Sequence, residues 1–202
     1  MSQNPFLLLL MIGGGLYIGK LWRDDLRSAA IGESHPQALP GATPCTRRAL
    51  VTACLGSIVL LAGETWGEYR LGVVTEQSNM TVLFALNSLV APIIEETIFR
   101  GYLVINGRGH AVRWLGIVVA SALFALLHPF LWVWEDGLVF TLTIKGAFST
   151  IAAFAFSLWF YHVRFARWNS RHSLLPCFAA HGMKNLGVIV IKAVQGFLTG
   201  WW

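Results

Sequence analysis

Charged side chains are scarce in this sequence of 202 residues, which contains 15 lysines and arginines, 10 aspartates and glutamates, and 55% hydrophobic residues. Only 12% of the chain is charged, whereas an ordinary soluble domain has about 25%. A water-soluble globule needs a polar coat, and these acids and bases are too few to form one. The shortage excludes a disordered or nucleic-acid-binding tail protein. Together with a mean hydropathy of +0.60, it predicts that lipid is the solvent for most of the surface.

Cysteine is also scarce. Cys45, Cys54 and Cys177 have no paired spacing typical of a zinc or redox motif. The sequence contains neither a Gly-x-Ser-x-Gly nucleophile elbow nor a His-Glu-x-x-His zinc helix. Cys177 precedes His181 by one helical turn without a recognisable activating group, and we interpret it as a small buried side chain. These absences leave no indication of a covalent nucleophile.

Long apolar runs are abundant instead, and a transmembrane helix needs about 20 mostly apolar residues. Six runs approach that length, which predicts an all-α, polytopic membrane helix bundle. We expect one integral-membrane domain over residues 1–202, because the sequence has no internal repeat and its length suits a single bundle. The predicted spans are about Pro5–Trp22, Ala49–Gly63, Met80–Ile105, Arg113–Trp134, Leu138–Val163 and Leu174–Leu198.

Basic residues fall almost entirely on one side of these spans. Lysine and arginine collect in short cytoplasmic loops, so six spans with both termini outside place ten basic residues in the cytoplasm and only Arg70 outside. We therefore interpret the net charge of +5 as topology and expect no nucleic-acid partner. We expect an integral protein of a bacterial inner or cell membrane. The ten residues are Lys20, Arg23, Arg27, Arg47, Arg48, Arg108, Arg113, Arg164, Arg167 and Arg171.

The third span contains three charged residues, in the segment VAPIIEETIFRGYL. An ionisable group at the bilayer centre costs about 2.5 to 3.5 kcal/mol, so each requires a partner or a function. Glu96 and Arg100 are four residues apart and face each other on a helix, which predicts a buried ion pair. Glu95 is rotated by about 100° from Glu96. It therefore points to another helix, a cavity or water, and it is a candidate general base.

Two further spans contain polar side chains at helical spacing. His128 follows Phe124 by one turn in SALFALLHP, and in AAHGMKNLG His181 and Asn185 are four residues apart and project together. Hydrogen bonding between helices explains each motif taken alone. At about 1.5 Å per residue, however, both motifs and Glu95 lie in the middle band of a bilayer core about 30 Å thick. Together they predict a polar intramembrane cavity that activates a water and stabilises an oxyanion.

These motifs resemble the CPBP intramembrane proteases, also called the Abi or CAAX-protease family, which include the type II CAAX prenyl endopeptidases. The resemblance covers about residues 82–192 and depends on the order Glu-Glu-x-x-x-Arg-Gly, Phe-x-x-x-His and His-x-x-x-Asn, of which EETIFRGYL is the specific part. It implies a helical membrane fold in which Glu95 and His128 activate the attacking water. It also implies that His181 and Asn185 hold the oxyanion. The residues that would support the site are Glu96, Arg100 and Phe124.

The first hypothesis for function is therefore an intramembrane endopeptidase that acts on a membrane-associated protein or peptide within the lipid bilayer. Glu95 would deprotonate the water, and His128 would orient it and pass a proton to the leaving amine. We expect no cofactor, and a variant in which Glu95, His128 and His181 bind zinc stays open. Two other hypotheses are a non-catalytic membrane scaffold or immunity or resistance factor that uses the cavity for binding, and a small transporter, suggested by Lys145 within a span.

Overall fold

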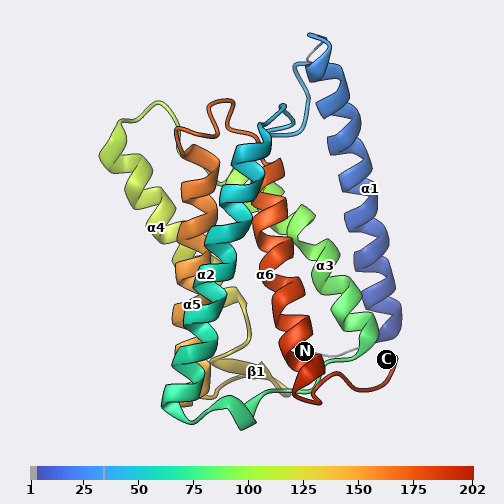
Figure 1. Ribbon diagram of the computed structural model, residues 1–202, viewed down its shortest axis with the longest axis vertical. Helices are drawn as coiled ribbons and strands as arrows, with labels where there is room; N and C mark the ends of the chain where they lie inside the picture. The colour runs from blue at the N-terminus through green and yellow to red at the C-terminus, as the bar shows by residue number, and fades with distance from the viewer. Residues whose placement is uncertain (1–3, 34) are drawn as a thin grey trace.

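The computed structural model describes residues 4–33 and 35–202 and places six long helices side by side (Figure 1). Within these residues, six helices are long and apolar enough to cross a membrane, which confirms the predicted polytopic bundle. The helices are α1 (Pro5–Ala30), α2 (Arg47–Leu71), α3 (Val82–Glu96), α4 (His110–Leu127), α5 (Ile144–Phe165) and α6 (Leu175–Val194). The shorter elements are the 3-10 turn η1 (Val74–Glu76), the π-helical turn η2 (Thr97–Tyr102) and the strands β1 (Trp132–Trp134) and β2 (Leu138–Phe140).

Polar residues set where four of these helices begin. The side chain of Asn4 accepts two backbone N–H groups of the first turn of α1, and Pro5 occupies the first helical position. Thr46, Thr81 and Thr143 each accept one backbone N–H in the same way at the start of α2, α3 and α5. Each cap satisfies a donor that the helix itself leaves unpaired. The caps therefore fix the positions at which these apolar segments enter the bundle.

The start of α1 and the C-terminal residues lie on the same face of the bundle (Figure 1). We call this face the terminal face, and it also carries the connections from α2 to α3 and from α4 to α5. The opposite face carries the other three connections, and we call it the loop face. The described residues of these connections are 31–33 with 35–46, 103–109 and 166–174. The nine arginines and Lys20 that were predicted to be cytoplasmic lie toward the loop face. An even number of crossings thus agrees with both termini on one side.

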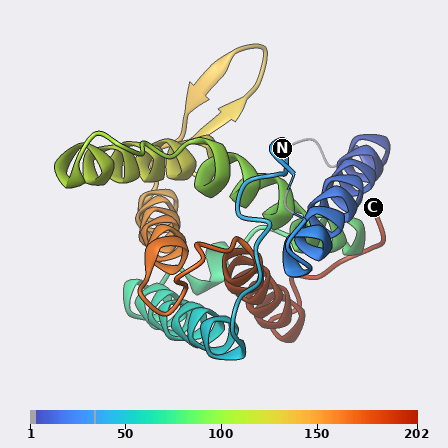
Figure 2. The same cartoon turned by 90° about the horizontal axis from the view of Figure 1, so that it is seen from above.

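Helix α6 lies among α2, α3 and α5 and packs against each of them, while α1 packs against α3 and α4 against α5 (Figure 2). The larger cluster of buried apolar side chains joins α1, α2, α5 and α6 and includes Trp22, Phe156, Phe160 and Cys177. The outward faces carry many exposed leucine, isoleucine and valine side chains. That pattern is expected where lipid replaces water around a protein. Buried polar side chains lie inside the bundle, on α2 and α4 as well as on α3, α5 and α6.

The fourth and fifth predicted spans are wrong at the terminal face. Helix α4 ends at Leu127 rather than Trp134, and α5 begins at Ile144 rather than Leu138. The segment between them contains β1 and β2, which pair as a two-stranded antiparallel sheet. This hairpin projects beyond the ring of helices (Figure 2). Part of the apolar sequence assigned to two spans thus forms a hairpin at the terminal face.

Local backbone preferences explain this hairpin. His128 adopts an extended conformation, with φ of −76° and ψ of 127°, because the following Pro129 disfavours a helical conformation before it. At the tip, Asp136 and Gly137 have φ values of 48° and 156°, which a residue without a side chain or a short polar residue tolerates best. The indole of Trp132 donates to a backbone carbonyl in the last turn of α4 at 2.8 Å. The hairpin is therefore tied to the helix that carries His128.

The first two predicted spans are correct in place but too short. Helix α1 continues beyond Trp22 to Ala30, and α2 continues beyond Gly63 to Leu71. In α1 the extra turns are charged and exposed at the loop face. In α2 they carry acidic residues, and Glu68 is buried within the bundle. Hydropathy alone therefore ended both spans before the helices end.

Candidate active site

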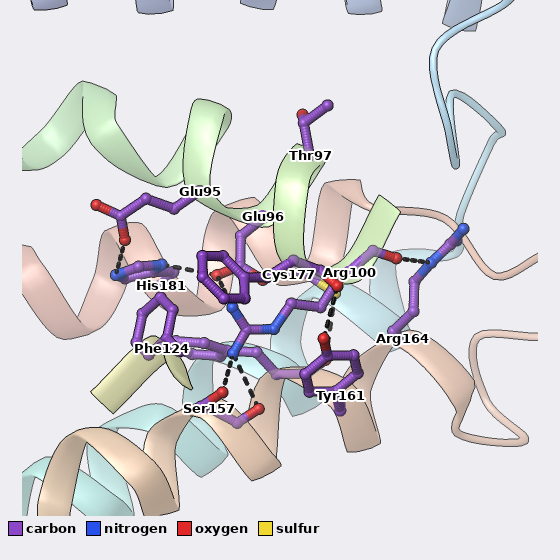
Figure 3. A network of polar contacts seen from close by, with 12 residues as sticks. Glu95, Glu96, Thr97, Arg100, Phe124, Ser157, Tyr161, Arg164, Cys177 and His181 are labelled. Carbon is purple, nitrogen blue, oxygen red and sulfur yellow. Dashed lines mark hydrogen bonds and ion pairs between the residues drawn. The ribbon is translucent and has the colours of Figure 1, made fainter. Parts of the chain in front are cut away.

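The predicted ion pair between Glu96 and Arg100 is confirmed at the junction of α3 and η2. Arg100 Nη1 lies 3.2 Å from Glu96 Oε1, and neither side chain is exposed to solvent. A buried pair is more stable when its remaining polar atoms are also satisfied; among the described residues Glu96 Oε2 and Arg100 Nε have no partner. Arg100 Nη2 donates to the backbone carbonyl and the hydroxyl of Ser157 at 3.0 and 2.6 Å (Figure 3). The guanidinium thus joins α3 to α5.

Aromatic rings enclose the rest of the Arg100 guanidinium. Its Cζ lies 4.7 Å from the ring centroids of Phe124 and Tyr161. It lies 5.6 and 5.3 Å from those of Phe99 and Phe160. Contacts of this kind stabilise a desolvated cation. Phe124, which was expected to support the site, therefore connects α4 to the same charged group.

The six residues of η2 are wound as a π-helical turn, a feature that is frequent at functional sites. Side chains of α5 satisfy two of its carbonyl groups. The hydroxyl of Tyr161 lies 2.6 Å from the carbonyl oxygen of Phe99, and Arg164 Nε donates to the carbonyl oxygen of Arg100 at 3.2 Å. These contacts fix the turn that follows the two glutamates.

His181 on α6 lies between the two adjacent carboxylates (Figure 3). Its Nδ1 is 2.8 Å from Glu96 Oε1, and its Nε2 is 3.7 Å from Glu95 Oε2. A carboxylate accepts hydrogen bonds, so Nδ1–H donates to Glu96. The ring stacks on Phe160 with centroids 4.7 Å apart. Arg100, Glu96, His181 and Glu95 therefore form one continuous chain of contacts.

Glu95 and Glu96 point in different directions, as their rotation on the helix predicts. The side chain of Glu95 is 32% exposed, whereas that of Glu96 is completely buried. Within the described chain, Glu95 Oε2 is buried and has no hydrogen-bond partner. Its distance from His181 Nε2 is beyond direct hydrogen-bonding range. A carboxylate oxygen in this position is available to a water or a substrate.

His128 ends α4, and one hydrogen bond fixes its tautomer. Its Nδ1 lies 2.8 Å from the carbonyl oxygen of Phe124, which can only accept, so Nδ1 carries a proton. In the neutral ring Nε2 therefore has a free lone pair. The ring packs against Phe124 at 4.7 Å and stacks on Phe130 at 5.6 Å between centroids. His128 is thus oriented as a proton acceptor at Nε2.

Phe124 brings the two imidazoles together. Its ring centroid lies 4.7 Å from that of His128 and 6.0 Å from that of His181. Both histidines therefore lie beside this ring, and His181 in turn lies between Glu95 and Glu96. No hydrogen bond or ion pair joins His128 to Glu95 among the described residues. A bridging water or substrate group is needed to connect them.

Asn185 contacts α3 on the terminal-face side of the glutamates. Its Nδ2 donates to the carbonyl oxygen of Ser88 at 2.7 Å. One N–H of the amide is therefore occupied, and the second is left for another acceptor. Asn185 follows His181 by one turn of α6, so the two side chains project from the same face.

Sequence reasoning missed three residues of α5 that hold this site. Ser157, Tyr161 and Arg164 contact Arg100 or the η2 backbone. They are spaced by four and three residues, so they share one face of the helix. A polar residue at each turn of an apolar span was the available signal. The interpretation of Cys177 is confirmed, because this side chain is fully buried.

The donor atoms proposed for zinc do not form a closed ligand set. Across residues 4–33 and 35–202, no group of three or more histidine, cysteine, aspartate or glutamate side chains could hold a metal ion. Glu95 and His181 approach to 3.7 Å, but Nδ1 of His181 is directed to Glu96. His128 Nε2 is the remaining candidate ligand with a free lone pair.

The fold and this constellation define an integral membrane protein with a polar intramembrane site. Residues 77–187 match the family model described as type II CAAX prenyl endopeptidase Rce1-like. The match spans more than half of the 202 residues, so the chain belongs to this family. No curated protein and no solved structure matches the chain. Membership supports an endopeptidase kind of function, and the matched segment contains all four candidate catalytic residues.

Proposed function

We propose that this protein is an intramembrane endopeptidase that hydrolyses a peptide bond of a membrane-associated protein or peptide. One observation carries the proposal: His181 lies between Glu95 and Glu96, and of the two glutamates only Glu95 is accessible. A carboxylate with an unbonded oxygen beside an imidazole is suited to general acid–base hydrolysis of an amide. Membership of the endopeptidase family supports the same reaction class.

Glu95 is the proposed general base. Its Oε2 takes a proton from a water, and the water oxygen attacks the substrate carbonyl carbon to form a tetrahedral oxyanion. His128 accepts a hydrogen bond from this water at Nε2 and so orients it. The proton then passes from Glu95 to His128 Nε2 through a bridging water or substrate group. From Nε2 it is transferred to the leaving nitrogen as the C–N bond breaks. The new carboxyl product keeps the water oxygen. No covalent intermediate with the enzyme is needed.

His181 and Asn185 are the proposed oxyanion donors. Asn185 has one N–H left after its bond to Ser88. With Nδ1–H bound to Glu96, His181 donates from Nε2 only when its ring carries a second proton. Donors fixed before the reaction stabilise developing charge without reorganisation. Glu96 and Arg100 act in this scheme by holding His181 in place.

The topology supports a location in a cell membrane with the loop face in the cytoplasm. Basic residues gather at the loop face, and cytoplasmic loops carry such an excess. We propose that both termini lie outside and that the host is bacterial. The substrate is then a peptide that enters the bundle from the bilayer or one of its surfaces, and the whole chain acts as a single domain.

Comparison of peptide termini in membranes tests the proteolytic function. Membranes from cells that express the wild type are compared by mass spectrometry with those that express Glu95→Gln at the same level. The proposal predicts termini that appear only with the wild type. Glu135→Gln, the same change at an exposed position of the hairpin tip, is the control and should behave as wild type. Identical termini for all three proteins would overturn proteolysis and favour a non-catalytic scaffold.

Metal analysis of the purified protein tests the metal-free mechanism. The mechanism predicts that chelation leaves peptide cleavage unchanged. Stoichiometric zinc whose removal abolishes cleavage and whose return restores it would contradict the mechanism. In that case Glu95, His128 and His181 would be assigned as ligands, and a zinc-bound water would be the nucleophile.

A further inference from the structure

A stripe of polar residues runs along the inward face of α2, apart from the site described above. Ser57, Glu64 and Glu68 are separated by seven and four residues, so they lie on one side of the helix. Ser57 is completely buried and Glu68 nearly so. From the end of α2 at Leu71, these residues lie at depths of about 4 Å for Glu68, 10 Å for Glu64 and 21 Å for Ser57. Polar side chains therefore continue from the terminal face to the middle of the bundle.

Glu68, at the terminal-face end of this stripe, has partners from two other segments. Lys145, which the sequence suggested as a transporter residue, forms an ion pair with Glu68. Gln77, in the connection from α2 to α3, donates to the second oxygen of Glu68 at 2.7 Å. Lys145 is therefore part of a polar cluster between α2 and α5 at the terminal face.

Lys184 connects the stripe to the candidate active site. It lies on α6 between His181 and Asn185, with its Nζ 5.5 Å from the ring centroid of Phe156. It interacts electrostatically with both Glu64 and His181. No ion pair is formed by Lys184 within the described residues. From the end of α6 at Val194, Lys184 and His181 lie at depths of about 15 and 20 Å.

Several oxygen atoms along this route are buried without a partner. Ser57 Oγ, Glu64 Oε2 and Glu95 Oε2 form no hydrogen bond within the part of the chain that the structure describes. Buried polar atoms in native proteins are paired with protein groups or with ordered water. A buried water needs two to four polar partners, and this route supplies carboxylates, a hydroxyl and an ammonium at successive depths. Isolated polar atoms in an apolar bundle would be costly.

We propose that these residues line a hydrated path through the terminal-face half of the bundle, by which water, the second substrate of hydrolysis, reaches Glu95 and His181. The path runs from the Glu68–Lys145 pair past Glu64 and Lys184, between α2, α5 and α6. The role of the path in supplying water for catalysis rests on the proposed hydrolytic function. The presence of water along the path is independent of that function, because water can fill it whether or not a peptide is cut.

Cysteine accessibility tests the path. Ser57→Cys replaces a buried hydroxyl with a thiol of similar size, and Lys184→Cys places a thiol beside the site. The matched controls are Leu55→Cys and Leu186→Cys, each two residues away on the same helix but 56% and 44% exposed to the surroundings of the bundle. Each protein is reconstituted in sealed vesicles, and a charged, membrane-impermeant thiol reagent is added at the terminal face. The wild type, with its native cysteines, is the blank.

The path predicts labelling of both inward cysteines at least about tenfold faster than their lipid-facing controls, because only a hydrated thiol ionises and reacts. Glu64→Leu in the Ser57→Cys protein should slow labelling, whereas Glu64→Gln, which keeps polar atoms, should not. Absence of labelling at both inward positions in protein that elutes as a folded, monodisperse species would overturn the path. Equal rates at inward and lipid-facing positions would overturn it too. If the protein cleaves no peptide, the proposed function fails while the labelling pattern stands.

Discussion

Asn185 donates a 2.7 Å hydrogen bond to the carbonyl oxygen of Ser88, the carbonyl that Pro92 leaves without a donor inside α3. In an α-helix the N–H four residues later bonds each carbonyl, and proline has no N–H. The Asn185 amide on α6 therefore replaces the hydrogen bond that Pro92 cannot donate. Pro92 lies three residues before Glu95. This contact links the position of the proposed base to the helix that carries His181.

The hydrogen bond from Asn185 to the Ser88 carbonyl predicts that substitutions of Asn185 and Pro92 have non-additive effects on the free energy of unfolding. Asn185→Ala should lower the free energy of unfolding by about 1 kcal/mol, because the Ser88 carbonyl loses its partner. In a Pro92→Ala background the helix supplies an N–H for this carbonyl, so the same change should cost less. Thermal unfolding of the four proteins in detergent gives the coupling energy.

The same four proteins separate the structural role of Asn185 from a catalytic one. If Asn185 also donates to the oxyanion, its loss lowers kcat whether or not Pro92 is present. Recovery of full peptide cleavage by the double variant would show that Asn185 has only a structural role, the hydrogen bond that holds α3 in its conformation. Additive unfolding energies would contradict the replacement of the helical bond.

Arg100 is predicted to be the most sensitive residue for stability. Arg100→Met leaves Glu96 as a buried charge without its cation and should cost about 3 to 5 kcal/mol. Adding Glu96→Gln removes that charge and should restore part of the loss. The unfolding midpoint in detergent measures both effects, with Arg70→Met at an exposed position as control. An Arg100→Met midpoint equal to that of the wild type would contradict the buried pair.

The sequence was sufficient to predict this pair, because a spacing of four residues on a helix leaves few alternatives. It was sufficient for six spans as well, since apolar length alone selects them. The contact between Asn185 and Ser88 was predictable only in part. Pro92 within a helix indicates that the Ser88 carbonyl lacks its usual backbone donor. Which side chain would satisfy that carbonyl depends on how α3 and α6 pack, and spacing along one chain does not encode that distance.

Hydropathy gave the wrong end for the fourth predicted span and the wrong start for the fifth, because the hairpin after His128 contains apolar residues. Residues 132–134 and 138–140 are as apolar as the helices beside them, so they were assigned to the ends of two spans, with Glu135, Asp136 and Gly137 between them. The signals for the hairpin were local ones: Pro129, and the Asp136–Gly137 pair that is typical of hairpin turns. Tyr161 and Arg164 were missed because their partners are carbonyl groups of the π turn, which has no distinct sequence pattern. Ser157 was missed because its partner, the Arg100 guanidinium, lies 57 residues away in the sequence.

His128 is predicted to be essential for turnover but not for folding. His128→Asn retains an N–H that can donate to the Phe124 carbonyl but lacks a proton acceptor at the Nε2 position. We expect kcat to fall by about 10²–10⁴-fold, the usual effect of losing a general acid–base group. KM and the unfolding midpoint should change little. Wild-type kcat in this variant would remove His128 from the proton path.

Two glycines provide a matched test of the packing near the site. A Cβ on Gly146 would lie 2.2 Å from the backbone oxygen of Phe130, whereas a Cβ on Gly182 meets no atom within 4 Å. Gly146→Ala should therefore destabilise the protein by about 1 to 3 kcal/mol and displace the hairpin from α5. Gly182→Ala should be neutral or stabilising by up to about 1 kcal/mol, as alanine favours the helix. Equal unfolding midpoints for the two variants would show that the hairpin does not pack against Gly146.

The rate of peptide hydrolysis by purified Glu95→Gln protein tests the central claim most directly. The substrate is a peptide that the wild type cleaves, and Glu135→Gln serves as the control. Because glutamine cannot take a proton from water, kcat should fall by about 10²–10⁴-fold while the unfolding midpoint and the Glu135→Gln rate stay at wild-type values. Cleavage by folded Glu95→Gln protein at the wild-type rate would contradict the assignment of this carboxylate as the base.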